Sequence, residues 1–347
     1  MKVLMALSGG VDSSVAAAEL LRDGHAVVGI TMRLWGGDSD TGCCSIADVD
    51  DARRVAQQLG IDHLVFNFTD DFDEHVVAPY VAAHEQGLTP NPCIECNRHL
   101  KFHRLSERAD LLGFDAVATG HHARIVERDG VRFVARGHDM TKDQSYVVHM
   151  LPQHELARTL FPIGHLTKAA VRERAAQLGL RTATKPDSQD VCFITHDGGR
   201  TAFLGSRISF RPAKVVDALD GSPLGTVEAL EMVTLGQRRG IGLPGGGPKR
   251  YVVDIDHETA TVKVGDEAML QCDSTFVGRL TWAHRPVVGE VLVQSSAHGA
   301  TAAATIAPTE DGVVVRWSVP QRRVSPGQSV VFYDTSDTCV LGGGIAG

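Results

Sequence analysis

Short apolar runs alternate with amphipathic helical patterns over the first 195 residues of the chain. This alternation predicts a parallel β-sheet with helices on both faces, because parallel strands need long crossovers and are buried on both sides. Ligands of such sheets bind at the carboxyl ends of the strands. Buried strands are predicted at 2–7, 27–34, 63–68 and 116–119, helices at 13–22, 48–59, 98–112 and 167–178, and a hairpin at 123–136 with its turn at 129–130.

After about residue 205 the pattern changes to short β runs that are separated by Gly, Pro and Asp. The runs lie at 213–217, 251–256, 261–264, 275–281, 289–293, 312–317 and 329–333. They predict one or two small β domains. We expect a break near residue 273, where one β unit ends and another begins.

The composition restricts the class of protein. The chain has 347 residues, of which 43% are hydrophobic and 22% charged, as in a folded globular protein. Its formal net charge is −8, so a nucleic-acid partner requires the basic side chains to gather on one face. Seven cysteines without a secretory signal pattern indicate reduced thiols, metal ligands or redox catalysts. No apolar run reaches membrane-spanning length, and we expect a cytoplasmic protein.

Residues 8–14 read Ser-Gly-Gly-Val-Asp-Ser-Ser and lie between the first predicted strand and the first predicted helix. Adjacent glycines let the backbone approach an anion, and the N–H groups at a helix start carry partial positive charge. The run therefore predicts a phosphate site, without the lysine of a Walker loop. The alternative is a glycine turn in which Asp12 or Ser13 only caps the helix.

Two further runs carry cysteines. Residues 90–97 read Pro-Asn-Pro-Cys-Ile-Glu-Cys-Asn, and residues 187–194 read Asp-Ser-Gln-Asp-Val-Cys-Phe-Ile. If Asn97 caps the helix that follows, Cys96 lies at a helix N-terminus, where the dipole favours a thiolate. Cys192 is either a second reactive thiol or a buried, inert residue beside Phe193 and Ile194.

The phosphate run resembles the pyrophosphate loop of the N-type ATP pyrophosphatases, which cleave ATP to AMP and pyrophosphate while they adenylate a substrate oxygen. Together with the two cysteine runs, it makes essentially the whole chain similar to the bacterial tRNA-specific 2-thiouridylases (the MnmA or TrmU family). Further matching runs lie at 119–122, 142–146, 160–164, 234–240, 325–328 and 339–344.

This resemblance implies ATP-dependent 2-thiolation of the wobble uridine in the tRNA anticodon loop. Uracil O2 would be adenylated, and a cysteine persulfide would then supply sulfur, giving AMP and pyrophosphate. The implied fold is α/β, with an N-terminal parallel-sheet ATP pyrophosphatase domain (1–200), a central β-rich tRNA-binding domain (205–272) and a C-terminal β-barrel (273–347). A sulfur donor such as a cysteine desulfurase or relay protein is implied, and we expect a monomer.

The resemblance also implies roles for individual residues. Cys96 would be the nucleophile, and Cys192 would carry the persulfide and form a transient disulfide with Cys96. ATP, with Mg²⁺ near Asp12, would contact Ala6, Leu7, Ser8, Gly9, Gly10, Val11, Asp12, Ser13, Met32 and Gly120. The tRNA and its target base would contact Asn91, Pro92, Cys93, His121, Lys142, Asp143, Gln144, Arg238, Arg239 and Gln328, with added phosphate-binding charge from Lys249 and Arg250. Met32 as a core thioether and Gly120 as a turn glycine are the alternatives.

Cys93 departs from family members that carry Asp at this position, and three interpretations remain open. It is a spare thiol beside Cys96, or a ligand of a [4Fe-4S] cluster together with Cys96 and Cys192. The third is a zinc site made of Cys93, Cys96, His99 and His103. A second departure is Ser296-Ala297-His298, which stands where several members have Arg-Tyr-Arg. RNA contact at that position is therefore in doubt.

Two rival functions are compatible with parts of the pattern. Another pyrophosphatase-loop ligase that uses ammonia would need no pair of cysteines. A non-catalytic tRNA-binding protein would need no intact phosphate loop.

Overall fold

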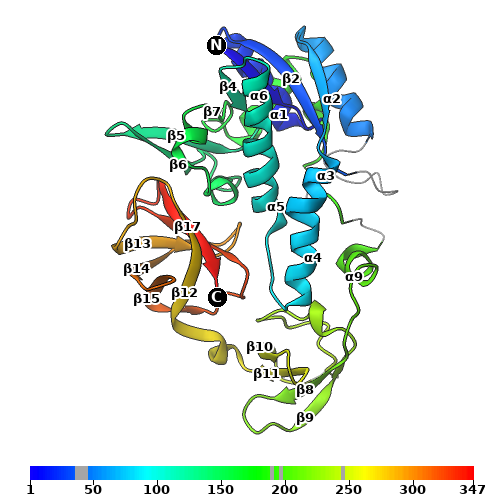
Figure 1. The fold of residues 1–347 in the computed structure, drawn as a ribbon, viewed down its shortest axis with the longest axis vertical. Coiled ribbons are helices and arrows are strands. Elements are labelled where there is room, and N and C mark those ends of the chain that lie inside the picture. Colours follow the sequence, from blue (N-terminus) through cyan, green and yellow to red (C-terminus); the bar gives the residue numbers. More distant parts are fainter. Residues whose placement is uncertain (36–45, 188–190, 195–197, 244–246) are drawn as a thin grey trace.

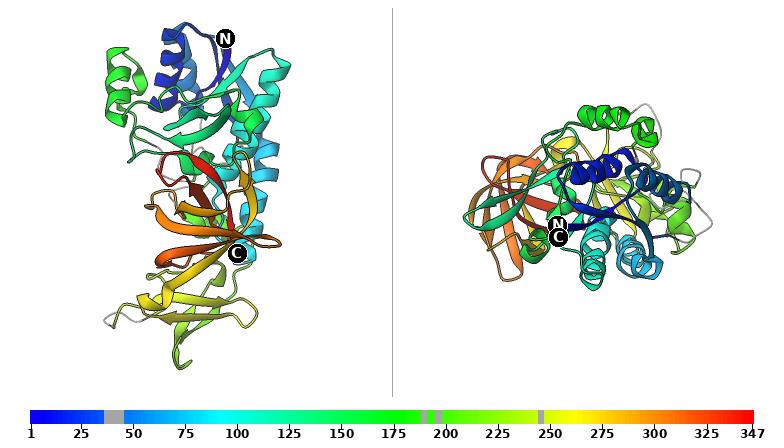
Figure 2. Two further views of the ribbon diagram at one scale, coloured as in Figure 1. Left: turned by 90° about the vertical axis from the view of Figure 1, so that its left-hand side faces the viewer. Right: turned by 90° about the horizontal axis from the view of Figure 1, so that it is seen from above.

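The computed structural model describes residues 1–35, 46–187, 191–194, 198–243 and 247–347. A five-stranded parallel sheet lies at one end of the elongated molecule and a four-stranded sheet at the other, with a closed barrel of six strands between and beside them (Figures 1 and 2). The predicted α/β fold with a C-terminal β-barrel is confirmed. Among the described helices, none combines the length and the apolar composition needed to cross a bilayer.

The parallel sheet has the strand order β3-β2-β1-β4-β7. Alternate residues of the central strand face opposite sides: Val3 and Met5 pack with α1 and α8, and Leu4 packs with α4 and α6. Helices therefore cover both faces, as predicted. The strands are β1 (Lys2–Ala6), β2 (Ala26–Arg33), β3 (His63–Asn67), β4 (Ala116–Ala118) and β7 (Thr159–Leu160). The prediction that 63–68 is buried is wrong, because β3 is an edge strand with Val65 44% exposed.

Helices at 13–22, 48–59 and 167–178 are confirmed by α1 (Val11–Arg22), α2 (Ile46–Leu59) and α8 (Lys168–Gln177). Gly24, Gly60 and Gly113 follow the ends of α1, α2 and the helix that ends at Leu111, and their φ angles lie between 69° and 79°, in the left-handed region that favours glycine. The further helical segments are α3 (Thr69–Phe72), η1 (Asp73–Val77), α4 (Ala78–Glu85), η3 (Ser145–Val148), α7 (Gln153–Leu156), η4 (Arg181–Thr184), α9 (Gly199–Gly205), η5 (Leu230–Met232) and η6 (Glu267–Leu270).

The helix predicted to start near Asn97 begins earlier. Helical backbone runs through α5 (Pro92–Glu95), the π-helical segment η2 (Cys96–Arg104) and α6 (Leu105–Leu111). Asn91 is the N-cap, since its Oδ1 accepts a hydrogen bond from the Cys93 N–H at 3.1 Å, and a proline follows at the first helical position. The prediction that Asn97 caps this helix is therefore wrong.

The four-stranded sheet has the order β10-β11-β8-β9 and a small apolar core that includes Val215, Val252 and Val262. Its strands are β8 (Ala213–Asp217), β9 (Pro223–Val227), β10 (Tyr251–Asp256) and β11 (Thr261–Gly265). Strand β9 was not predicted, because it contains Pro223 and Gly225, which are unfavourable in strands. Proline is tolerated there because β9 is an edge strand.

The barrel closes in the order β12-β15-β14-β13-β16-β17. Its strands are β12 (Gln271–Trp282), β13 (Gly289–Gln294), β14 (Ala302–Pro308), β15 (Gly312–Arg322), β16 (Ser329–Tyr333) and β17 (Val340–Ala346). Position 273, where we expected a break, lies inside β12. The missed strands β14 and β17 are rich in Ala and Gly, which have low β-propensity.

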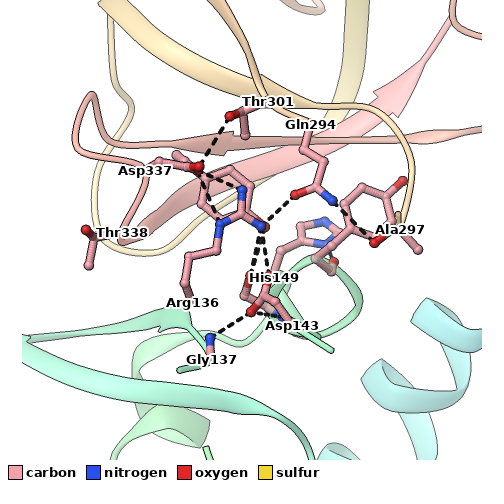
Figure 3. Close-up of polar contacts among 12 residues, drawn as sticks. Arg136, Gly137, Asp143, His149, Gln294, Ala297, Thr301, Asp337 and Thr338 are labelled. Carbon is pink, nitrogen blue, oxygen red and sulfur yellow. Dashed lines mark hydrogen bonds and ion pairs between the residues drawn. The ribbon is translucent and has the colours of Figure 1, made fainter. Parts of the chain in front are cut away.

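A buried arginine joins the barrel to the N-terminal part of the chain (Figure 3). Arg136 ends the hairpin β5 (Ala123–Arg128) and β6 (Val131–Arg136), whose two-residue turn was predicted correctly. Its guanidinium donates hydrogen bonds to Asp143 (2.8 Å), Gln294 (2.7 Å) and Asp337 (2.7 Å). It also lies 3.7 Å from the centre of the Tyr333 ring. These contacts tie the 139–145 loop to the barrel wall.

Candidate functional site

The glycine-rich loop lies where β1 ends and α1 begins. Gly10 is the N-cap of α1, and no side chain in the described part of the chain caps this helix, so the alternative in which Asp12 or Ser13 is the cap is wrong. Side-chain hydroxyls shape the loop instead: Ser13 Oγ donates to the Gly10 carbonyl at 3.1 Å and accepts from the Ser8 N–H at 3.2 Å. The start of α1 is thus available to an anion.

Two glycines let other chain segments pass close to this loop. Gly9 has φ +71°, and a Cβ at this position would lie 2.4 Å from the Asp48 carbonyl oxygen. A Cβ on Gly120, just after β4, would lie 2.6 Å from the Ser13 nitrogen. Gly120 therefore adjoins the loop at the carboxyl edge of the sheet. Met32, at the end of β2, is 8% exposed and packs in the same apolar cluster as Ala6.

An ion network covers the start of α1. Lys168 Nζ lies 2.7 and 2.8 Å from the two carboxylate oxygens of Asp12 and 2.9 Å from Asp187. Asp187 also pairs with Lys142 at 2.9 Å and Arg172 at 2.8 Å. Burial alone would raise the pKa of Asp187, but its hydrogen bonds with lysines lower it to about 2. Both Asp12 and Asp187 are thus ionised at neutral pH.

The other side of the loop is held by a second lysine. Lys185 Nζ donates to the Gly9 carbonyl at 3.0 Å and pairs with Asp48 and Asp51, each at 2.7 Å. Burial would lower the pKa of Lys185, but hydrogen bonds with the two carboxylates outweigh it and raise the pKa. The backbone of the loop is therefore fixed from outside by a permanent positive charge.

Four residues of these networks were not predicted as site residues: Lys168, Arg172, Lys185 and His122. His122 is 3% exposed, and its Nε2 lies 3.1 Å from Asp12. Lys168 left one signal in the sequence: it is a cation in the first turn of a predicted helix, where the helix dipole disfavours positive charge. Such a residue is expected to reach an anion elsewhere.

A pocket of about 500 Å³ lies between α4, the residues that precede α5, the Cys192 segment, α9 and the barrel. Its lining includes Tyr80, His84, Asn91, Pro92, Arg200 and Gln328. Three of these were predicted to contact the tRNA or its target base. Gln328 Nε2 donates to the Thr89 carbonyl at 2.6 Å, which joins the barrel to the pocket wall. Burial, reinforced by the charge of Arg200, lowers the pKa of His84 to about 4, so this ring is neutral at pH 7.

The two predicted catalytic cysteines belong to one apolar cluster beside this pocket. Cys96 is 6% exposed, and Cys192 packs against the same cluster. Phe193 anchors the second cysteine segment, since its ring centre lies 5.7 Å from that of Phe72 and 5.4 Å from that of Tyr80. Residues 188–190 of this run lie outside the described part of the chain. All five cysteines that the structure describes are free of disulfide bonds.

The helix N-terminus expected for Cys96 is occupied by Cys93. Because α5 starts at Pro92, Cys93 lies in its first turn and is exposed, whereas Cys96 lies one turn farther in. Asn97, the expected cap, instead donates from Nδ2 to the Val147 carbonyl at 2.8 Å.

The residues proposed for a metal site do not fit one in this arrangement. Across the described ranges, no three His, Cys, Asp or Glu side chains gather around a possible metal position. His99 Nε2 lies 3.3 Å from Glu95, and its ring stacks on His75 with centres 4.7 Å apart. His103 is 59% exposed and faces Glu107. Neither the zinc site nor the three-thiolate cluster is assembled.

Several residues predicted to contact tRNA are buried or paired. His121 is 8% exposed, hydrogen-bonds to Thr119 and packs near Phe102 and Phe161; burial holds its pKa well below the usual value. The Asp143 side chain is 5% exposed and pairs with Arg136 (Figure 3). In this structure both side chains are held by protein groups, and their contacts with RNA stay predictions.

Lys142 and Gln144 lie at the edge of the ion network. Gln144 Oε1 accepts a hydrogen bond from the His122 N–H at 2.8 Å, and Lys142 pairs with Asp187 as described above. Both residues are therefore placed to support the phosphate loop.

The basic side chains of the four-stranded sheet divide into two kinds. Arg238 and Arg239 are exposed, on a loop between η5 and β10 that contains Gly236 and Gly240 with positive φ. Lys249 is also exposed, but Arg250 is half-buried and pairs with Asp217 at 2.5 Å. Arg250 is therefore the weakest candidate of the four for a phosphate contact.

The barrel loop at 295–298 is anchored to the protein by its backbone and by Ala297, whereas Ser296 and His298 are exposed. Gln294 Nε2 donates to the Ser296 carbonyl at 2.8 Å, and Ala297 packs against the apolar cluster shared with the N-terminal part. The loop thus supports the junction at Arg136 (Figure 3).

Three protein-family models match the chain in succession. A model described as the tRNA methyl transferase HUP domain matches residues 1–196. One described as the tRNA methyl transferase PRC-barrel domain matches residues 201–266. An aminomethyltransferase beta-barrel domain matches residues 273–346.

Curated relatives match over nearly the full length. The chain is 46% identical to the tRNA-specific 2-thiouridylase MnmA of Chloroflexus aurantiacus over 355 residues, which cover 99% of this chain and 97% of the relative. The proteins of the same name are 45% identical in Mycobacteroides abscessus and 44% identical in Rhodococcus jostii. These matches cover 99% of this chain and 99% and 97% of the two relatives.

Proposed function

Because this chain belongs to the tRNA-specific 2-thiouridylase (MnmA) family, we propose that it uses ATP to replace O2 of the tRNA wobble uridine with sulfur. One observation carries the proposal: segments that flank both cysteines line a single pocket. The pocket is lined by Asn91 and Pro92, which precede Cys96 in the chain, and by Val191 and Ile194, which lie on either side of Cys192 in the chain. The volume of about 500 Å³ lies within the usual range for ligand sites.

The phosphate loop activates the base in this proposal. A carbonyl oxygen is a poor leaving group, so uracil O2 first attacks the α-phosphorus of ATP and pyrophosphate departs. The free N–H groups of α1 and the flanking glycines hold the departing pyrophosphate. When bound, Mg²⁺ neutralises phosphate charge. Asp12 is our candidate to hold it, together with the phosphates, since the described residues do not gather three donors of their own.

Sulfur transfer follows at the cysteines. The terminal sulfur of a Cys192 persulfide attacks C2, and AMP leaves with the oxygen. The Cys96 thiolate then attacks Sγ of Cys192, which releases 2-thiouridine and forms a Cys96–Cys192 disulfide. A two-electron reductant restores the thiols, and a cysteine desulfurase or relay protein supplies the next sulfur atom. An iron–sulfur cluster has no part in this sequence.

The uridine must leave the anticodon stack to reach the cysteines. The polar groups of Asn91 and Gln328 are suited to frame the extruded base.

We assign residues 1–200 to catalysis, 205–272 to tRNA binding and 273–347 to a barrel that supports the pocket through Gln328. We further propose that the enzyme acts as a monomer in the cytoplasm. Methyl transfer, which the descriptions of two family models name, would not require the two cysteines.

The function is tested by mass analysis of tRNA nucleosides. Purified protein, ATP, a persulfide donor and unmodified tRNA should yield 2-thiouridine at the wobble position, with one AMP and one pyrophosphate per base. Cells that lack the protein should lose that nucleoside. Unchanged wobble uridines in such cells would reject the proposal, and product formation with ammonia in place of persulfide would favour an amide-forming ligase.

Neutralising Arg238 or Arg239 should weaken tRNA binding uniformly across substrates. Each lost phosphate contact should reduce the slope of log Kd against log salt by about one. Filter binding over a range of salt concentrations measures the slope, with Arg250→Gln as the matched comparison because that side chain is already paired with Asp217. Slopes unchanged in both single variants would make Arg238 and Arg239 ordinary solvated residues.

A further inference from the structure

We propose that Lys168 is a phosphate-binding residue of the ATP site that moves from Asp12 and Asp187 to the β- and γ-phosphates when the nucleotide binds. The inference rests on the proposed function, because it requires ATP at the start of α1. It adds a residue of the α8 helix to a site otherwise built from the β1–α1 loop and Gly120.

The position of Lys168 supports this role. It is the first residue of α8 after the N-cap Thr167, whose hydroxyl accepts the Ala170 N–H at 3.1 Å. A helix start disfavours a cation, yet the Lys168 side chain is only 11% exposed and reaches across to Asp12, in the first turn of α1. Its ammonium group thus stands beside the uncapped end of α1, where the phosphates would dock.

The network can release Lys168 without leaving its acids unpaired. Asp187 retains Lys142 and Arg172, and Asp12 retains His122. The carboxylates of Asp12 and Asp187 are shared among Lys142, Lys168 and Arg172, and Asp139 accepts a hydrogen bond from the Lys168 backbone N–H at 3.0 Å. Nδ1 of His122 is buried and has no hydrogen-bond partner among the described residues, so this ring can also rearrange without breaking a bond on that side.

A phosphate group arriving at α1 meets the negative charge of Asp12 first. If Lys168 stayed bound to Asp12, it would cancel that charge only in part. If it transfers to the phosphates, it makes charge-assisted hydrogen bonds to the groups that AMP lacks. The proposal therefore predicts a selective effect on ATP, whereas a purely structural ion pair would affect ATP and AMP alike.

The test compares nucleotide affinities of the full-length protein without tRNA. Isothermal titration with ATP, AMP and inorganic pyrophosphate is carried out in magnesium buffer on wild type, Lys168→Met and Lys168→Gln. Lys214→Met, on the exposed face of β8, is the charge-matched control. We expect both Lys168 variants to bind ATP and pyrophosphate at least tenfold more weakly and AMP within twofold of wild type, and the control to be unchanged.

Circular dichroism melting accompanies each titration. Lys168→Gln can still donate a hydrogen bond to Asp12, so it carries the comparison if the methionine variant fails to fold. Unchanged ATP affinity in a folded Lys168 variant, or equal losses for ATP and AMP, would overturn the inference. A wild-type protein that bound neither ATP nor pyrophosphate would instead overturn the proposed function.

Discussion

Alanine at Cys96 or at Cys192 is expected to reduce 2-thiolation to below about a thousandth of the wild-type rate, because each thiol makes or breaks a bond to sulfur that no neighbouring group can replace. Adenylation takes place before either thiol reacts, so both variants should still release pyrophosphate in the presence of tRNA and ATP. Parallel assays of labelled pyrophosphate and of 2-thiouridine by mass spectrometry separate the two steps. A Cys192→Ala variant that still thiolated tRNA would contradict the relay.

Cys93 supplies the matched control for that experiment. It is exposed in the first turn of α5, and Cys93→Ala removes a thiol from the same helix without opening the buried cluster around Cys96. A persulfide relay should retain at least about half of its activity in this variant. Cys272→Ala, in the barrel, controls for general cysteine loss. Iron and activity that disappeared together in Cys93→Ala after anaerobic reconstitution would require a cluster.

The sequence was sufficient to place the glycine-rich loop between β1 and α1, because the loop is a contiguous run of residues. Adjacent glycines indicate a tight loop without information from distant residues, and Gly9 does have a positive φ. The loop lies at the carboxyl edge of the sheet, as the strand–helix alternation predicted. The start of the Cys96 helix was misplaced because two asparagines compete as caps. Proline at the first helical position favours Asn91 as the cap. The helix N-terminus that was predicted for Cys96 therefore lies at Cys93.

The ion network could not be predicted from a local pattern. Lys168 contacts Asp12 across 156 positions of the chain, and Lys185 contacts Gly9 across 176. Periodicity and turn residues describe neighbours within a few positions, whereas these pairs depend on how α8 and η4 pack against α1. The burial of His121 could not be predicted from local pattern either, because His121 stands in a motif of polar residues yet packs against Phe102 and Phe161.

Asp12→Ala is expected to reduce tRNA-stimulated pyrophosphate release by about 100-fold or more, since a small displacement of bound reactants has effects of that size. In the free protein Asp12 orients Lys168 and His122 beside the start of α1. Burial would raise its pKa, but those two hydrogen bonds lower it, so Asp12 presents a negative charge at working pH. Its removal takes away the carboxylate that we assign to Mg²⁺ and the hydrogen-bond partner of His122 Nε2.

The fold should survive this change, because the Asp12 side chain is 32% exposed and ion pairs open to solvent contribute only about 1 kcal/mol or less. The melting temperature should therefore fall by only a few degrees. Asp12→Asn separates charge from shape: the amide can still hydrogen-bond to Lys168 or His122, but it cannot balance a cation. If charge is the essential property, ATP should still bind to Asp12→Asn while pyrophosphate release is lost as in Asp12→Ala. Rapid release by the asparagine variant would show that Asp12 only shapes the loop, and unimpaired release by both variants would remove the loop from the adenylation step.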